Sequence, residues 1–134
     1  DISYGIYLGY CGANTLRGNV VSLNDWGIEL YSSTGSTIKE NLVKNNTWGL
    51  YLEDNAKGNY IYHNNIVTNV KQAYQSPSSS PNIWRTPSTP FQGNYWSDYK
   101  GSDTNNHHAC ESGIRWFQMA VLCGSSSEAD RQEE

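Results

Sequence analysis

Three similar stretches of sequence decide the fold of this chain. They read Tyr4-Gly5-Ile6-Tyr7-Leu8, Trp26-Gly27-Ile28-Glu29-Leu30 and Trp48-Gly49-Leu50-Tyr51-Leu52, and each begins 22 residues after the one before. A fainter fourth start follows at Lys71-Gln72-Ala73-Tyr74. Self-similarity at a fixed period of this length is typical of a solenoid. Inside each stretch the aliphatic side chains recur at every second position, which indicates a β-strand.

Asparagine recurs at regular positions between these strands. The chain has 15 Asn, all within residues 1–106, and within a repeat they recur every five residues, as at Asn14, Asn19 and Asn24. A period of five does not follow one face of an α-helix, and Asn is a poor residue for a helix interior. Asn does suit tight bends, because it tolerates the left-handed conformation and bonds to nearby backbone. We therefore expect short strands joined by bends, with equivalent Asn side chains hydrogen-bonded along the stack.

Three short strands per repeat predict an all-β fold, a right-handed parallel β-helix (solenoid) of about three coils over residues 1–74. Equivalent residues then stack about 4.8 Å apart as ladders. A leucine-rich repeat fits less well because no unit reads L-x-x-L-x-L-x-x-N, and a pentapeptide coil lacks the Gly-Ile-x-Leu strand. The expected interior ladders are Ile6/Ile28/Leu50, Leu8/Leu30/Leu52, Leu16/Ile38/Ile61 and Val21/Val43/Ile66.

The sequence changes character after the repeats. Residues 75–106 hold all four prolines and the segment Gly93-Asn94-Tyr95-Trp96-Ser97-Asp98-Tyr99, and we expect an extended Pro/Ser-rich loop followed by an aromatic cap. Residues 107–134 contain no Asn and predict an atypical, poorly ordered tail. Cys110 and Cys123 could pair there and leave Cys11 free. Three coils bury few aliphatic side chains, so we expect further coils or a cap before Asp1.

Charge and composition exclude several classes of protein. A net charge of −4 argues against nucleic acid as the main partner. No apolar run approaches the roughly 20 residues of a membrane span. The sequence has no Gly-rich phosphate loop, no Ser/His/Asp set and no H-E-x-x-H motif, so we expect no cofactor and no metal site in the coils.

The Asn-punctuated coils and the closing Gly93–Tyr99 segment resemble the NosD-like right-handed parallel β-helix family, also known as periplasmic copper-binding or carbohydrate-binding-and-sugar-hydrolysis repeats. The resemblance covers about residues 4–106 and implies an exported protein that is extracellular, at the cell surface or periplasmic. Its named member assists copper-site maturation in nitrous-oxide reductase. The family continues into an Asp-rich stretch, and this chain departs from it at His107. The resemblance therefore supports no calcium site at Asp103 and Asn105.

The outward face of the Gly-Ile-x-Leu sheet is the first candidate site. Tyr rings offer apolar faces with a polar tip, which suits sugars. Glu29 and Glu53 would have Cα atoms about 8 Å apart, which is compatible with the ~6.5–9.5 Å between the carboxyls of an inverting glycosidase. The alternative is a solvated face of Tyr and Glu with no specific role. The candidate carbohydrate-binding residues are Tyr7, Glu29, Tyr31 and Tyr51, and the candidate catalytic residues are Glu29 and Glu53.

Three further groups are weaker candidates. The row Arg17/Lys39/Tyr62, with Glu40 and His63 nearby, could contact acidic polysaccharide or be ordinary surface charge. Asn45-Asn46-Thr47 is a sequon that would lie at a coil corner. The third group has side chains that suit Cu(I) or zinc but no known ligand spacing, and it consists of His107, His108, Cys110, Met119 and Cys123.

These observations predict an exported β-helix module for scaffolding or carbohydrate binding without catalysis. Its expected partner is a polysaccharide or a cell-surface glycan. One alternative is a glycoside hydrolase or polysaccharide lyase that uses Glu29 and Glu53. The other alternative is a copper-handling accessory protein, and it rests on the resemblance alone.

Overall fold

The computed structural model describes residues 1–89 and 92–98. These residues form short strands and a single 3-10 turn, η1, at Pro77–Ser79. The strands are β1 (Tyr4–Gly9), β2 (Thr15–Arg17), β3 (Val20–Ser22), β4 (Trp26–Tyr31), β5 (Thr37–Lys39), β6 (Leu42–Lys44), β7 (Trp48–Glu53), β8 (Tyr60–Tyr62), β9 (Asn65–Val67), β10 (Lys71–Gln75) and β11 (Tyr95–Trp96).

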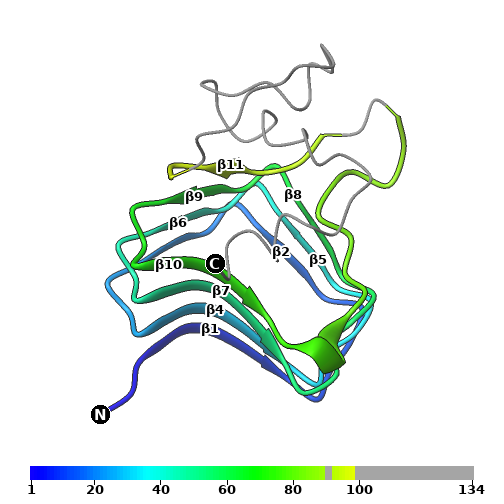
Figure 1. Ribbon diagram of the computed structural model, residues 1–134, viewed down its shortest axis with the longest axis horizontal. Coiled ribbons are helices and arrows are strands. Elements are labelled where there is room, and N and C mark those ends of the chain that lie inside the picture. Colours follow the sequence, from blue (N-terminus) through cyan, green and yellow to red (C-terminus); the bar gives the residue numbers. More distant parts are fainter. Residues whose placement is uncertain (90–91, 99–134) are drawn as a thin grey trace.

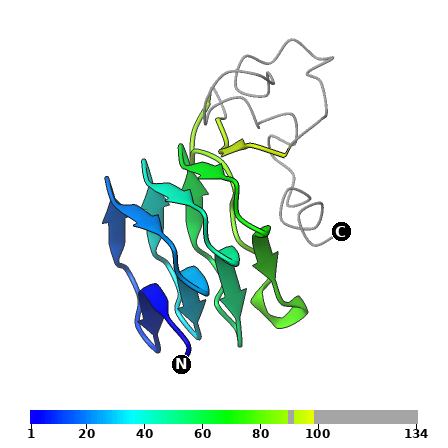
Figure 2. The same cartoon turned by 90° about the vertical axis from the view of Figure 1, so that its left-hand side faces the viewer.

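The strands assemble into three parallel sheets. Their orders are β1-β4-β7-β10, β2-β5-β8 and β3-β6-β9-β11, so each of the first three coils contributes one strand to each sheet. Figure 1 shows the three sides of the coil, and Figure 2 shows successive coils lying side by side. The expected all-β parallel β-helix is therefore confirmed.

The strand register confirms the four interior ladders. Ile6 pairs with Ile28, and Ile28 pairs with Leu50, as the 22-residue period predicts. The other three ladders keep the same register across β1–β9. Ile28 and Ile38 are fully buried, whereas Ile6 in the first coil is only partly buried. The apolar core is thus a narrow stack of Ile, Leu and Val inside the coils.

A ladder of glycines lets the coils approach each other closely. Gly5, Gly27 and Gly49 hold the second position of β1, β4 and β7. A Cβ atom on Gly27 would lie 2.6 Å from the carbonyl oxygen of Gly49 and 3.0 Å from Cγ1 of Val43. Real Cβ contacts are essentially never shorter than 3.0 Å, so any other residue here forces backbone apart.

Buried asparagines join the coils through hydrogen bonds, as the sequence predicts. In the longest ladder, Oδ1 of Asn64 accepts from the backbone N–H of Asn41 at 3.0 Å and from its Nδ2 at 2.9 Å. Nδ2 of Asn64 in turn donates to Oδ1 of Asn94 at 2.9 Å and to the carbonyl oxygen of Ile38 at 2.8 Å. Because Asn64 is fully buried, these bonds satisfy backbone groups that water cannot reach.

The expectation that these asparagines occupy the left-handed bends themselves is wrong. In the first three coils the residue before each ladder Asn takes the positive φ instead, for example Leu23 (64°) before Asn24 and Glu40 (57°) before Asn41. The left-handed residue turns the chain, and the Asn that follows points its amide inward. Local propensity predicts Asn as the bend residue. In the structure its side chain is buried and hydrogen-bonded between coils, and the preceding residue forms the bend.

Residues 71–96, which include the Pro/Ser-rich stretch and part of the expected aromatic cap, return to the register of the third coil at three places and so form a fourth, less regular coil. β10 pairs with β7, Ile83 forms a parallel bridge to Tyr60, and β11 pairs with β9. Trp84 and Trp96, which are 2% and 1% exposed, are buried in this coil, and Trp96 lies in register with Ile66. The fourth coil therefore places two indoles where the other coils carry aliphatic residues.

Several sequence-based expectations fall outside the described residues. They concern the predicted tail at 107–134, the pairing of Cys110 with Cys123, and Asp103 and Asn105. Cys11, which is described, is a half-buried free thiol. No helix in the described part of the chain has the length and apolar character needed to cross a membrane.

Candidate functional site

The outer face of the β1-β4-β7-β10 sheet brings the predicted site residues together. Tyr7 pairs with Glu29, and Glu29 pairs with Tyr51 on the next coil. In the neighbouring row, Tyr31 lies between Gly9 and Glu53. The register expected from the repeat thus places every predicted sugar-contacting residue on one surface.

Four further aromatic residues belong to this surface and were missing from the predicted site. Tyr4 stacks on Trp26 with ring centroids 5.4 Å apart. Trp48 contacts Tyr51 edge to face at 5.0 Å, and Tyr74 stacks on Tyr51 at 4.8 Å. The sequence carried the signal, because Tyr4, Trp26 and Trp48 open the three repeats and Tyr74 lies in the fourth start.

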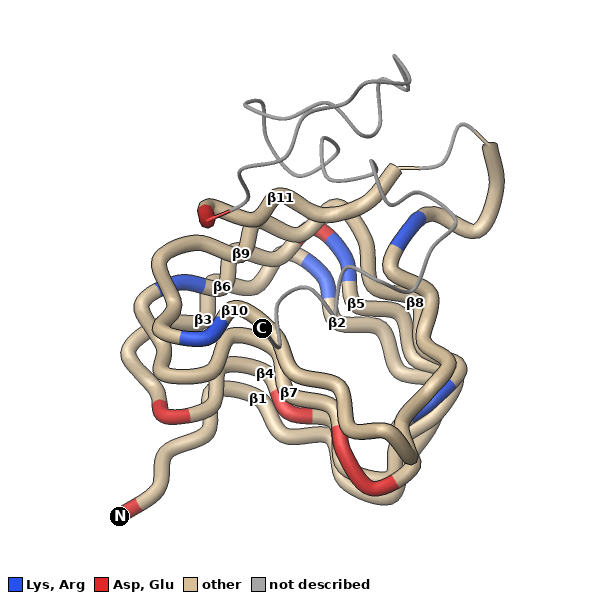
Figure 3. Tube along the Cα trace, viewed as in Figure 1, with Lys and Arg blue, Asp and Glu red and all other residues tan. Residues whose placement is uncertain are grey.

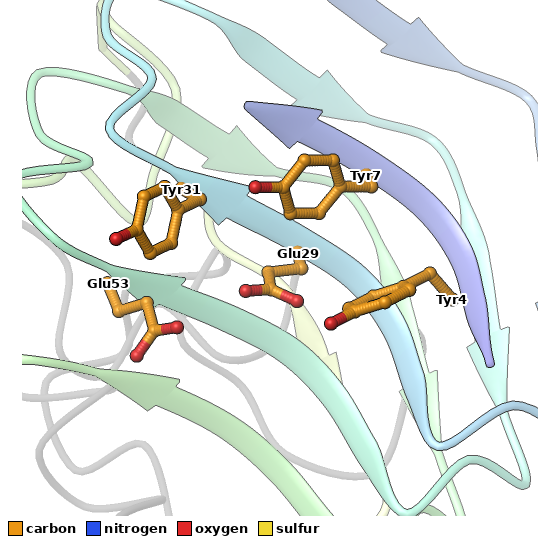
Figure 4. A pocket seen from close by; sticks show the side chains of 5 residues that line it. All are labelled: Tyr4, Tyr7, Glu29, Tyr31 and Glu53. Atoms are coloured by element: carbon orange, nitrogen blue, oxygen red, sulfur yellow. The ribbon is translucent and has the colours of Figure 1, made fainter. Parts of the chain in front are cut away.

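Glu29 interrupts a ladder of tyrosines and leaves a hollow. Its row reads Tyr7, Glu29, Tyr51, Tyr74 from β1 to β10. A glutamate is shorter than a tyrosine, so the surface dips where the ring is missing. The resulting open hollow has a volume of about 340 Å³, and Figure 4 shows its lining by Tyr4, Tyr7, Glu29, Tyr31 and Glu53.

The carboxyl of Glu29 lies at the floor of this hollow and is not the solvated group that an exposed face predicts. The residue is only 4% exposed. Burial and, to a lesser extent, the nearby carboxyl of Glu53 together raise the pKa of Glu29 to about 7.

Glu53 is the second carboxyl of the hollow, as the sequence predicts. It lies on β7, opposite Tyr31 and one coil away from Glu29, and both side chains line the hollow (Figure 4). The two carboxyls that the sequence offers as candidate catalytic residues are therefore neighbours on one surface.

Tyrosine hydroxyls at the rim are tied to acidic neighbours. Hydrogen bonds with Tyr10 and with Asp54, together with the charge of Asp54, raise the pKa of Tyr31. Burial and the charge of Glu29 raise the pKa of Tyr7. Tyr7 and Tyr31 therefore stay neutral across the physiological range of pH.

The β2-β5-β8 sheet carries the other predicted rows. Arg17, Lys39 and Tyr62 are in register, and Nε of Arg17 lies 2.5 Å from Oε2 of Glu40. Glu40 thereby offsets one of the two positive charges of this row. In the sequon, Asn45 is exposed at a corner, as expected, and its Oδ1 accepts from Oγ1 of Thr68 at 2.6 Å.

The described residues do not fit a copper site. Within residues 1–89 and 92–98, no group of three or more His, Cys, Asp or Glu side chains is placed to hold a metal ion. The Cu(I)-type group that the sequence contains, from His107 to Cys123, lies outside the described residues.

Comparison with known proteins gives one match. The family model described as periplasmic copper-binding protein (NosD) matches residues 1–101, which is most of the chain and nearly all of its described part. No curated protein and no solved structure matches the chain.

Proposed function

Because the chain belongs to the family described as periplasmic copper-binding protein (NosD), we propose that it is an exported β-helix module of the periplasm or the cell surface. We propose that the module binds carbohydrate on the outer face of the β1-β4-β7-β10 sheet. The observation that carries this proposal is the tyrosine-lined hollow over Glu29.

The chemistry of the hollow suits a sugar ring. Tyr4 and Tyr7 leave 45% and 48% of their surface exposed, so their rings are available to the apolar face of a pyranose. Glu29 and Glu53 supply carboxyl oxygens that accept hydrogen bonds from hydroxyl groups. A volume of about 340 Å³ lies at the lower end of the range for ligand sites. An open hollow of this size fits one or two sugar units of a longer chain.

Glycan-array binding by the full chain tests this proposal. Tyr7→Ala and Tyr31→Ala should each abolish or strongly weaken binding, because each removes a wall of the hollow. Tyr62→Ala on the β2-β5-β8 sheet is the matched control and should bind as the parent does. Unchanged binding by the Tyr7 and Tyr31 variants would contradict the proposed site.

A hydrolase or lyase that uses Glu29 and Glu53 is the second candidate. A carboxyl with a pKa of about 7 in a hollow is favourable for a general acid, and this observation supports the candidate. Reducing-sugar release from bound glycans, abolished by Glu29→Gln, would establish catalysis, whereas binding without product supports the non-catalytic module.

Copper handling is the third candidate, and the family description favours it. The ligands would have to lie outside the described coils. Copper(I) titration of the full chain and of a variant with His107→Ala, His108→Ala and Cys110→Ser tests this directly. Stoichiometric uptake that the triple variant loses would support copper handling, and equal uptake by both chains would exclude this ligand group.

A further inference from the structure

We propose that the hollow over Glu29 binds the ammonium group of an amino sugar, so that glycans with free amines bind more tightly than neutral or N-acetylated ones. This inference rests on the proposed carbohydrate site and adds the class of ligand. Two independent features of the hollow support it: an unpartnered buried carboxyl oxygen and a partial cage of aromatic rings.

The first feature is Oε2 of Glu29. This atom is buried and has no hydrogen-bond partner among the described residues. The side chain is 4% exposed and extends into the hollow, as Figure 4 shows. A buried carboxylate oxygen without a donor is costly, so it requires either a proton or a donor supplied by a ligand. An ammonium group supplies both the donor hydrogens and the opposite charge.

The second feature is the arrangement of rings around this oxygen. Tyr4, Tyr7 and Tyr31 line the hollow together with Glu53. Aromatic faces attract cations, and rings grouped around an acidic floor form the type of cage that binds ammonium ligands. A neutral hydroxyl gains much less from the same rings.

The distribution of charge around the hollow also favours a cationic ligand. None of the described residues that line the hollow is Lys or Arg. Figure 3 shows basic residues on the β2-β5-β8 side of the coil, where Arg17 and Lys39 lie. Uronic acids and sulfated sugars are therefore disfavoured in the hollow, and a cationic sugar is favoured.

An ammonium group would compete with the proton on Glu29. The groups that face Glu29 are Tyr4 and Tyr7 from β1, Tyr31 from its own strand, and Tyr51 and Glu53 from β7. The raised pKa of Glu29 means that this proton is present in weakly acidic solution and is lost above about pH 7.

Isothermal titration calorimetry with three β-1,4-linked hexamers provides the test: glucosamine, N-acetylglucosamine and glucose. We expect the full chain to bind the glucosamine hexamer about tenfold or more tightly than the other two at pH 7. Glu29→Gln should reduce this preference to less than about twofold. Glu40→Gln, which removes the same charge from the β2-β5-β8 side, should retain it.

The outcomes separate this inference from the proposed function. Equal binding of the three hexamers would overturn the ammonium site and leave the carbohydrate site standing. Absence of binding to every glycan would overturn both. Spermidine, a polyamine without a sugar, is the control ligand. If it binds as tightly as the glucosamine hexamer, the assignment to an amino sugar is overturned. Circular dichroism confirms that the Glu29→Gln chain is folded.

Discussion

Asn64→Ala removes the side chain at the centre of the longest asparagine ladder. The loss leaves the backbone N–H of Asn41 without its acceptor and removes a donor from the carbonyl oxygen of Ile38. Both groups lie in buried bonds of the ladder. At about 1–3 kcal/mol for each unsatisfied buried group, the free energy of unfolding should fall by about 2–6 kcal/mol.

Urea denaturation followed by tryptophan fluorescence measures this change in the free energy of unfolding. Alanine variants of two other asparagines serve for comparison. Asn19 makes one side-chain bond, at 2.9 Å to Oδ1 of Asn41, in a partly buried position, so Asn19→Ala should cost about 0.5–1.5 kcal/mol. Asn65 is half-buried in β9, and Asn65→Ala should change stability by less than about 0.5 kcal/mol. Similar losses for Asn64→Ala and Asn65→Ala would refute the assignment of stability to the buried ladder. A variant too unstable to purify would agree with it, provided that Asn65→Ala folds.

Three other substitutions give further tests. Gly27→Ala should destabilise the fold by more than the roughly 1 kcal/mol expected for Gly18→Ala. A Cβ atom at position 27 would clash with backbone, whereas at position 18 it has free space and the only cost is the positive φ of 71°. Urea denaturation midpoints of the two variants measure the difference. Trp96→Ala should cost about 3–5 kcal/mol in thermal unfolding, because a fully buried ring is lost from the fourth coil. Glu29 has a folded-state pKa of about 7, above its ordinary value of 4.5, so its folded state holds the extra proton and stability should fall as pH rises from 4.5 to 7. Glu29→Gln should abolish that slope in urea titrations at pH 5, 6 and 7, and an unchanged slope would place the titrating group elsewhere.

The period of the sequence was sufficient to predict the coils and the rows on their surfaces. A shift of 22 residues aligns Ile6 with Ile28 and Tyr7 with Glu29, and strand pairing reproduces both pairs. The fourth coil was harder to predict, because residues 85–92 interrupt the spacing between Ile83 and the next ladder position at Asn94. Prolines in this interval suggest a loop, although the chain returns to the register of β9 afterwards.

The sequence predicted where the candidate site lies but not that Glu29 is buried in it. Alternation along β4 assigns Glu29 to the outer face, yet it says nothing of the large neighbours that cover it. The rings of Tyr4 and Trp26 come from the starts of β1 and β4, in register with each other and three residues before the level of Glu29. They stack only when the coils are in place. Burial of Glu29, and with it the shift in its pKa, therefore depends on tertiary packing that a repeat pattern does not contain.

The asparagine ladder also has a polarity. Each ladder Oδ1 accepts from the preceding coil, as at Asn41 and Asn64. Nδ2 of Asn64 donates both to Asn94 in the following coil and to the carbonyl oxygen of Ile38 in the preceding one. The amide oxygens of the ladder therefore all point toward the β1 side. Two β1 edges brought face to face would oppose oxygen to oxygen, which is repulsive. Coils therefore stack in one direction. A surface that extends the β1 edge has to present N–H donors to the amide oxygens of the ladder.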